Sequence, residues 1–497
     1  MSGKPSPALF NQLLLNELSL FVRKAVHELL PAGQTLKENW HIDAIIFALL
    51  NVVTGASKRL IINLPPQFLK SMICSVALPA FLLGRNPGMR IMCVSYNAEL
   101  ANNLHDYFLR LVQSPWYQNA FHPRIARAVM DSYETEDGGR RYAMSVDGKI
   151  TGYSADLIII DDPLNANDAF SKPERDRVNN FATGALFSRL SNKMEGRIIL
   201  VMQRLHAEDL SGYLLARAEW EHLCLPGIAP CDRLIQLPYG KTYALKEGEA
   251  LHSEFCDLKT LDRIKREMGT MAFNAQYLQE PMPAGESLLK PQYLRTYEAA
   301  PFKGPDYIIV QSWDTAVKDT PTSDYSVGLT LLARRRQVFL LDVYRQRVEF
   351  PDLRRDAISL ASKHRPDLIL VEESANGSAL LQLLKKQERW PSVIGVRPDT
   401  AKEARVARHT ATLEADPLYL PQRAAWLDDF KAEFLAFPQA RYDDQVDALA
   451  QFYNWYEGYQ SRVQFSFDMG FAGHSGSAHT ARLAAPSPSE VLGLLGR

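Results

Sequence analysis

The sequence is poor in cysteine and has almost no net charge. Its five cysteines among 497 residues include no CxxC pair, so we expect neither a disulfide framework nor a structural zinc site, and a reducing compartment fits best. The 56 Lys and Arg residues balance 57 Asp and Glu residues, which leaves a formal net charge of −1. Any contact with a polyanion such as DNA must therefore come from local basic patches.

Long apolar runs and a leader-like amino terminus are also missing. The longest apolar runs, Ile45–Val53 and Val76–Leu83, are far shorter than the roughly 20 residues that span a bilayer. No basic segment followed by an apolar one opens the chain. We therefore expect a protein of the cytoplasm with no membrane contact. Hydrophobic residues at 46% and charged residues at 23% exclude a fibrous or wholly disordered chain.

The first half of the sequence has the pattern of an α/β protein. Residues 8–53 carry apolar residues at a period near 3.6 and predict helices. Beyond them, short apolar runs alternate with longer amphipathic stretches, and the runs are residues 59–64, 90–96, 156–162 and 197–203. Buried strands that alternate with helices indicate a mainly parallel sheet covered on both faces.

The second half has a different order of elements. Residues 281–305 are rich in proline and predict an interdomain linker. The patterns that follow predict a strand, a hairpin, a helix, a strand, a helix and a short strand, at residues 306–314, 326–345, 352–363, 367–373, 376–387 and 392–396. Three strands in a meander followed by this alternation are typical of a ribonuclease H-like fold. We divide the chain into residues 1–280, the linker, residues 306–460 and a flexible tail at 461–497.

The segment RLIINLPPQFLKS predicts a strand, a tight turn and a helix that begins near Lys70 and Ser71. Backbone N–H groups at such a helix start hold phosphates, while the lysine reaches the terminal phosphates and the serine binds magnesium. The standard pattern GxxxxGK[ST] is broken, because Leu64 and Leu69 occupy its glycine positions. An ordinary helix start that binds no nucleotide therefore remains an alternative interpretation of this segment. The nucleotide-binding candidates are Pro66, Gln67, Phe68, Leu69, Lys70 and Ser71.

A second motif supports the nucleotide hypothesis. The apolar strand in ADLIIIDDP ends in Asp161 and Asp162, where the first carboxylate would hold magnesium and the second would orient the attacking water. A helix N-cap is the alternative for these two acids. The next apolar run ends in Gln203 and Arg204, and Gln203 could sense the γ-phosphate. The strand at 90–96, lying between the lysine loop and the acidic strand, fits the ATPase class with an added central strand.

Acidic residues also end two strands of the second half and begin a late helix. The candidates are Asp314, Glu372, Asp443, Asp444 and Asp447, and Asp447 shares a helix face with either of its two neighbours. Converging carboxylates could bind two divalent ions, which activate water and stabilise the leaving oxygen of a phosphodiester. Oxygen ligands favour Mg²⁺ or Mn²⁺, and we expect the metal ligands to be Asp314, Glu372, Asp444 and Asp447.

Each of these acids also has a purely structural explanation. Asp443 and Asp444 could stabilise the helix dipole, and Glu372 could pair with Lys363 or Arg365. Asp324 is a secondary candidate for the same site. The strand order makes convergence the better explanation of the set.

These separated blocks resemble the large terminase subunit of tailed bacteriophages and prophages. The resemblance runs from about Trp40 to Tyr456, through RLIINLPPQFLKS, ADLIIIDDPLNANDA, LVMQRLHAEDL, FNAQYLQEPMPAGES, SWDTAVKDTPTSDYSVG, VEESANG and FPQARYDDQVDALAQ. It implies a P-loop ATPase domain of the ASCE type, with an additional strand, followed by a ribonuclease H-like nuclease domain. Such proteins use ATP to move double-stranded viral DNA into a procapsid and cut concatemeric DNA with two metal ions.

The resemblance also implies partners and a location. The partners are the small terminase subunit, the portal protein of the procapsid and further copies of the chain, in a ring of five on the portal. The location is the cytoplasm of the host cell. By resemblance, Lys70 and Ser71 carry the nucleotide loop, Gln203 and Arg204 the coupling motif, and the second acidic group the nuclease.

The sequence departs from the family at several positions. Gln67 and Leu69 replace an arginine and a glycine of the usual loop. TGYS, at residues 151–154, stands where relatives often have TGRG. The source of an arginine finger is therefore open, and Arg140 or Arg141 could substitute.

Three basic segments are candidates for DNA contact, each with a solvated surface as the alternative. They are Arg334–Arg336 at the predicted hairpin tip, Lys385–Lys386 and Lys402–Arg408. We expect the hairpin to project beside the nuclease site. Two other functions stay open, namely a degenerate prophage remnant that only binds portal or DNA, and a repair-type ATPase-nuclease. The second usually has another ATPase lobe, and no such pattern follows residue 210.

Overall fold

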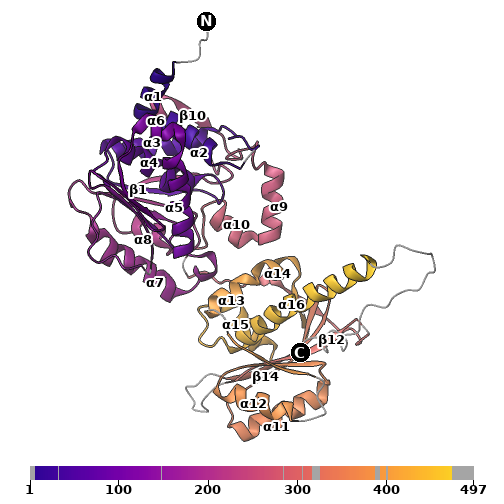
Figure 1. Ribbon diagram of the computed structural model, residues 1–497. Helices are drawn as coiled ribbons and strands as arrows, with labels where there is room; N and C mark the ends of the chain where they lie inside the picture. Colours follow the sequence, from indigo (N-terminus) through magenta and orange to yellow (C-terminus); the bar gives the residue numbers. More distant parts are fainter. Residues whose placement is uncertain are drawn as a thin grey trace. The chain divides into compact units, whose positions relative to one another are not determined.

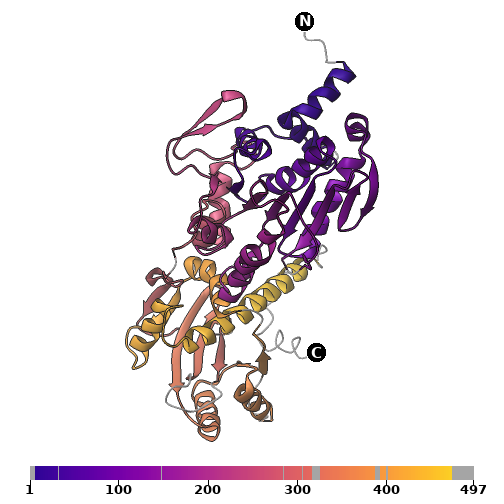
Figure 2. The same ribbon diagram turned by 90° about the vertical axis from the view of Figure 1, so that its left-hand side faces the viewer.

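The computed structural model describes residues 6–472 except 32, 147, 284, 305, 316–324, 387–391 and 399–400. The chain divides into two compact units, Met1–Ala284 and Gly285–Arg497 (Figures 1 and 2). Within the described ranges, no helix is both long and apolar enough to cross a membrane.

An eight-stranded sheet in the order β3-β4-β5-β2-β6-β7-β1-β8 forms the centre of the first unit. The six strands from β5 to β8 are parallel, and β3 and β4 are antiparallel additions at one edge. The strands are β1 (Arg59–Asn63), β2 (Arg90–Ser95), β3 (Ile125–Val129), β4 (Ser132–Thr135), β5 (Arg140–Ser145), β6 (Leu157–Asp161), β7 (Arg197–Met202) and β8 (Glu221–Cys224).

The order β2-β6-β7-β1-β8 is that of a P-loop ATPase with an additional strand, as the sequence predicts. The additional strand is β7, which pairs with both β1 and β6. Our assignment of that position to the strand at 90–96 was wrong, because β2 pairs with β5 and β6. Order along the chain does not reveal the insertion of a later strand between two earlier ones.

Alternating residues of the parallel strands enter two separate cores. Leu60 and Ile62 of β1 pack with the core formed by α2, α3, α4 and α5, whereas Ile61 packs with α7 and α8 on the other face. Both faces of a parallel sheet must be covered by apolar surface, which explains the continuous apolar runs. The helices are α1 (Pro7–Asn16), α2 (Leu18–Leu29), α3 (Trp40–Thr54), α4 (Leu78–Arg85), α5 (Ala98–Gln113), α6 (Pro115–Phe121), α7 (Lys172–Asn180), α8 (Leu210–Leu215), α9 (Leu258–Met268) and α10 (Thr270–Gln276). A small hairpin completes the unit with β9 (Arg233–Gln236) and β10 (Thr242–Leu245).

The second unit contains a seven-stranded sheet in the order β11-β17-β14-β13-β12-β15-β16. Its middle part has the ribonuclease H-like order that we predicted, with β12 between antiparallel β13 and parallel β15. Strands β11 and β17, which the sequence analysis missed, extend one edge. The strands are β11 (Leu294–Tyr297), β12 (Ile308–Asp314), β13 (Ser326–Arg334), β14 (Gln337–Gln346), β15 (Leu368–Glu372), β16 (Val393–Val396) and β17 (Leu418–Pro421).

Helices cover both faces of this second sheet (Figure 1). Trp313 of β12 packs against α11 and α12 on one face. On the other face, Ser312 Oγ donates to the carbonyl of Ala448 in α16 at 2.7 Å, and Gln451 Nε2 donates to Ser312 Oγ at 2.9 Å. The helices are α11 (Phe350–His364), α12 (Ala375–Lys385), α13 (Lys402–Arg408), α14 (Thr410–Ala415), α15 (Leu427–Ala436) and α16 (Asp444–Ala472).

Two predicted boundaries differ from the structure. Most of the stretch that we expected to be a linker is part of the second unit, because Leu288, Leu289 and Tyr293 are buried apolar residues and β11 joins the sheet. Helix α16 continues through Ala472, so residues 461–472 are helical, although we assigned them to a flexible tail. Residues 473–497 lie outside the described part of the chain.

Candidate nucleotide site and candidate nuclease centre

The loop after β1 has the backbone shape that glycines usually provide. Gln67 and Leu69 have φ values of 67° and 66°, which lie in the left-handed region and cost a residue with a side chain roughly 1–2 kcal/mol. The Leu69 side chain packs against the core, and this contact offsets the strain. Phe68 is buried and meets His41 and Phe255 edge-on. Its side chain is therefore a core group, and only its backbone can face a phosphate.

Five predicted residues come together at the carboxyl ends of β1, β6 and β7. Lys70, only 5% exposed, places Nζ 3.0 Å from Asp162 Oδ2 and donates to Gln203 Oε1. Ser71 Oγ donates to Asp161 Oδ1 at 2.9 Å. The Gln203 backbone N–H donates to Asp162 Oδ1 at 3.2 Å. The sequence prediction that these side chains converge is thus in agreement with the geometry.

Asp161 is a buried carboxyl group beside a second acid. Burial, followed by the neighbouring charge of Asp162, raises the pKa of Asp161 to about 7. Ser75 Oγ, one helical turn after Ser71, also donates to Asp161, at 2.6 Å. The sequence analysis missed Ser75, although the spacing of four residues in a helix was the signal for it. The hydroxyl of Ser71 and the carboxylate of Asp161 fit the oxygen ligands that Mg²⁺ prefers.

The end of β7 is tied to the last segment of the first unit. Arg204 Nε lies 3.0 Å from both oxygens of Asp209, whose side chain is fully buried. The Arg204 backbone N–H donates to Oε1 of Gln279 at 3.0 Å. Gln279 is itself buried and has a left-handed φ of 61°. The residue after Gln203 is therefore connected to the last segment of the first unit.

Neither Arg140 nor Arg141, the candidate substitutes for the absent arginine, faces the loop after β1. Arg141 is fully buried, with Nη1 2.6 Å from His105 Nδ1 and Nη2 donating to the Ser75 carbonyl at 2.9 Å. It contacts the helix that begins at Lys70 through this carbonyl. Arg140 forms an ion pair with Glu134 at 3.4 Å, at the side of β5. The suggestion that either one acts as an arginine finger is not supported by these positions.

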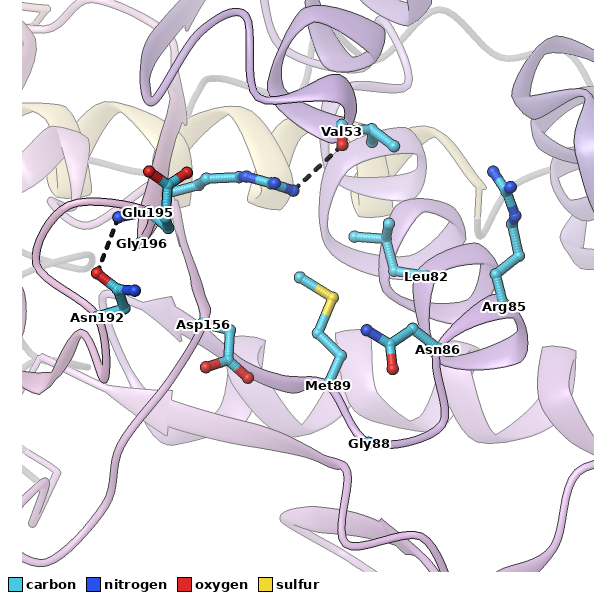
Figure 3. Close-up of a pocket in the computed structure, with 11 residues that line it drawn as sticks. Val53, Leu82, Arg85, Asn86, Gly88, Met89, Asp156, Asn192, Glu195 and Gly196 are labelled. Atoms are coloured by element: carbon cyan, nitrogen blue, oxygen red, sulfur yellow. Dashed lines mark hydrogen bonds between the residues drawn. The ribbon is translucent and has the colours of Figure 1, made fainter.

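A cavity of about 520 Å³ in the first unit lies elsewhere (Figure 3). Met89, Asp156 and Arg197, which line it, stand at the amino ends of β2, β6 and β7. Lys70 and Asp161 lie at the opposite edge of the sheet. The cavity is therefore not the candidate nucleotide site.

The second unit brings its predicted acids to one edge of its sheet. Asp314 ends β12, and Glu372 ends the adjacent parallel strand β15. Asp444 and Asp447, in the first turn of α16, are 3% and 1% exposed. Burial, and then the charges of Glu372, Asp447 and Asp444, raise the pKa of Asp314 well above its usual range. The carboxylates are thus close enough to repel one another.

Two basic residues of α13 lie among these acids. Lys402 Nζ is 2.8 Å from Asp443 Oδ1 and 2.6 Å from Asp447 Oδ2. Arg405, only 5% exposed, places Nη2 3.0 Å from Asp447 Oδ1 and Nη1 3.4 Å from Glu372 Oε2. Our interpretation of Lys402–Arg408 as a DNA-contacting surface was therefore wrong for these two residues, which act as counter-ions of the acidic cluster.

The donor types of this cluster suit a divalent metal, but the acids that the structure describes do not surround a single point. Among the residues that the structure describes, no three His, Cys, Asp or Glu side chains gather tightly enough to hold a metal ion. Both oxygens of Asp447 are paired with Lys402 and Arg405, so Asp447 can bind metal only if Lys402 moves away. The donors are all carboxylate oxygens, which suit Mg²⁺ or Mn²⁺. Asp324 lies outside the described residues.

The arginine hairpin does not lie beside the acids. Asp314 pairs with Val327 at one end of β13, whereas Ile308 pairs with Ala333 at the other end, next to the hairpin tip. Arg334 and Arg336 at that tip form ion pairs with Asp306 at 3.3 Å and Asp416 at 3.6 Å. The register contradicts our expectation that this hairpin projects beside the nuclease site. Lys385 and Lys386 are exposed near the end of α12.

One known family model matches part of the second unit. Residues 311–455 match the family model described as the terminase RNase H-like domain, and the match contains the acids from Asp314 to Asp447. The second unit is similar to terminase RNase H-like domains over these residues. The predicted resemblance to terminases is confirmed for this part of the chain, and the match spans β12 to the middle of α16.

Several solved structures are also similar to the chain. The large terminase of a thermophilic bacteriophage is 12% identical, with a TM-score of 0.45, over 81% of this chain and 97% of that one. The HK97 bacteriophage large terminase is 11% identical, with a TM-score of 0.37, over 87% and 98%. The large terminase nuclease of thermophilic phage G20c with bound magnesium is 15% identical, with a TM-score of 0.27, over 34% and 97%. No curated protein matches the chain. These structural similarities are too low to assign an activity.

Proposed function

We propose that the chain is the large subunit of a phage terminase, in which the first unit uses ATP to translocate double-stranded DNA and the second unit cuts it. One observation carries this proposal. A terminase RNase H-like domain with clustered acids is joined in one chain to a unit where Lys70, Ser71, Asp161, Asp162 and Gln203 converge. The resemblance adds the proposed partners, which are a small terminase subunit, a portal protein and a ring of five chains.

The ATPase mechanism follows from the contacts of Lys70. In the structure, Lys70 is paired with Asp162 and Gln203. Entry of ATP would draw Lys70 to the terminal phosphates, with Mg²⁺ held by Ser71 and Asp161. Asp162, released from the lysine, would then orient the attacking water. Gln203 would lose its lysine contact in the same step, and Arg204 would pass the change to Gln279.

The nuclease mechanism requires the acids of the second unit to gather around a phosphodiester. Bound divalent ions would activate the water and stabilise the leaving oxygen. Asp314 and Glu372 are fixed by neighbouring strands, and Asp444 by the Tyr325 backbone N–H, which donates to Oδ2 at 3.0 Å. Lys402 is paired with Asp443 and Asp447, so these two acids would hold a divalent ion only in place of that contact. Asp314, Glu372 and Asp444 are therefore the expected ligands. Asp447 would become a fourth ligand if Lys402 moved away.

The two rival functions lack support from specific residues. A degenerate remnant would not need a buried lysine paired with two separate strand ends, or four acids at one sheet edge. A repair-type ATPase-nuclease would need a second ATPase lobe. Among the described residues, the sheet after Gly285 has the order of a ribonuclease H-like fold instead.

The proposal is tested by separating the two activities in the full-length chain. ATP turnover should be lost in Lys70→Ala, while plasmid cleavage with Mn²⁺ is retained. Cleavage should be lost in Asp314→Asn, while ATP turnover is retained. ATP turnover that survives the Lys70 change would contradict the nucleotide site. Cleavage that survives the Asp314 change would contradict the nuclease centre.

A further inference from the structure

A group of aromatic and arginine side chains borders the nuclease centre. The arginine–tyrosine patch consists of Tyr325, Arg345, Arg347, Arg441 and Tyr442. The guanidinium carbons of Arg345 and Arg347 lie 4.0 and 3.9 Å from the Tyr325 ring centroid. The Arg441 guanidinium lies 5.2 Å from the Tyr442 ring, and the two tyrosine rings meet edge to face at 5.1 Å. Three guanidinium groups thus surround two touching rings.

Strand register places this patch at the same sheet edge as the acids. Val327 of β13 pairs with Asp314 on one side and with Arg345 on the other. The Tyr325 backbone N–H donates to Asp444 Oδ2 at 3.0 Å, and Tyr442 directly precedes Asp443. The patch is therefore adjacent to the acidic cluster on two separate chain segments.

The contacts of the patch fix its shape. Arg345, whose side chain is 19% exposed, lies 3.3 Å from Glu433 Oε2. Glu433 also accepts the backbone N–H of Gln445 at the start of α16, at 2.6 Å. Arg345 is thereby anchored to the helix that carries the acids. Arg347 is half-buried and Arg441 is exposed.

Stacked guanidinium groups suit the recognition of phosphate. A ring face holds the guanidinium plane in place while its N–H edge stays available for the oxygens of a phosphate, and a lysine cannot reproduce this geometry. An acidic cluster alone would repel a nucleic acid backbone. Positive charge beside it offsets that repulsion and fixes the position of the strand to be cut.

We propose that the arginine–tyrosine patch binds backbone phosphates of double-stranded DNA beside the bond that the acidic cluster cuts. This inference rests on the proposed nuclease function. It replaces the hairpin Arg334–Arg336 as the DNA-contacting surface of the second unit, because the hairpin lies at the opposite end of β13 from Asp314. Contacts of this kind carry no sequence specificity of their own.

The test measures DNA affinity in full-length chains that carry Asp314→Asn, so that binding is measured without cutting. A fluorescent duplex is titrated with the parent, with Arg347→Gln plus Arg441→Gln, and with the matched control Arg334→Gln plus Arg336→Gln. The patch variant should bind about tenfold more weakly, and its slope of log K against log salt should be shallower by about 1–2, since each lost phosphate contact removes about 0.9. The control should bind like the parent.

Further arms separate the possible failures. Arg347→Lys keeps the charge without the planar stack and should weaken binding less, which guards against a folding defect in the double variant. Unchanged duplex affinity and salt slope in the patch variant would overturn the inference. Loss of single-strand binding in Tyr442→Leu with duplex binding intact would also overturn it, because the rings would then stack on bases. The same patch variants with Asp314 unchanged are also assayed for DNA cleavage. If they cut DNA although the patch does not bind it, the proposed nuclease function is retained and only the patch inference fails.

Discussion

Lys70 Nζ lies 3.0 Å from Asp162 Oδ2. The residue that would bind the terminal phosphates of ATP is therefore paired with the residue that would orient the attacking water. ATP must break this pair to bind, so the same event that fills the site also frees Asp162. In the absence of nucleotide, the pair would keep Asp162 bound to Lys70, so that this carboxylate could not orient a water molecule.

Asp162→Asn should separate ATP binding from ATP hydrolysis. The variant loses the carboxylate that orients water, so turnover should fall by about 10²–10⁴-fold, the usual contribution of such a group. Binding of a fluorescent ATP analogue should be as tight as in the unchanged protein or tighter, because Lys70 no longer has a charged competitor. Lys70→Ala is the comparison and should lose both. Normal turnover in Asp162→Asn would exclude this role.

Asp209→Ala should destabilise the first unit strongly. The buried Asp209 carboxylate accepts from Arg204 Nε and from the backbone N–H groups of Leu205 and Gly212. Removing one partner of a buried ion pair costs about 3–5 kcal/mol, which urea unfolding can measure. Asp232→Ala is the control, since Asp232 pairs with Lys246 at the surface. Equal effects of the two changes would contradict the assigned importance of the Arg204–Asp209 pair.

His105 should make the stability of the first unit depend on pH. Burial, and then the nearby charge of Arg141, lower the pKa of His105 to about 4. Between about pH 6.5 and pH 4, His105 is protonated in the unfolded chain but neutral in the folded chain. The free energy of unfolding therefore falls as the pH falls. The loss is about 3 kcal/mol at most, by 1.36 kcal/mol per pKa unit.

The matched variant for this pH effect is His105→Gln. Its free energy of unfolding, measured in urea at pH 7.5 and pH 5, should fall less on acidification than that of the unchanged protein. An identical fall in both would show that His105 titrates normally in the fold.

Lys402→Met should lower the free energy of unfolding of the metal-free protein and raise its affinity for Mn²⁺. The change removes a counter-ion from Asp443 and Asp447. We expect a loss of about 1–2 kcal/mol without metal, less than for a fully buried pair because the Lys402 side chain is 44% exposed. Mn²⁺ should then bind more tightly, since it no longer competes with the ammonium group. Lys386→Met, at the end of α12, is the control. Weaker Mn²⁺ binding in Lys402→Met would contradict the competition.

Local patterns in the sequence predict the strands and the main site residues. Lys70 and Asp161 each follow a continuous apolar run, and parallel strands bring such positions to one edge without further information. Asp314 and Glu372 were predicted for the same reason. The added strands β11 and β17 have four residues each, which is too short for a period-2 pattern to be distinguished from a loop.

Side-chain partners from distant segments could not be predicted from one sequence. Arg405 lies in a run of basic residues, and only the packing of α13 against α16 turns it towards Asp447. Tyr325 and Tyr442 are far apart along the chain and meet because β13 and α16 begin at the same sheet edge. The hairpin arginines Arg334–Arg336 show the converse error. Three consecutive arginines predict a DNA contact beside the acids, but the strand register places them far from Asp314.

The most direct test of the central claim is the number of Mn²⁺ ions that the full-length chain binds. Electron paramagnetic resonance of free Mn²⁺ can count them without measuring any activity. We expect Asp314→Asn to bind two fewer ions than the unchanged protein, because Asp314 is the carboxylate that faces Glu372, Asp444 and Asp447. Equal numbers of ions in the two proteins would contradict a two-metal nuclease centre at these residues.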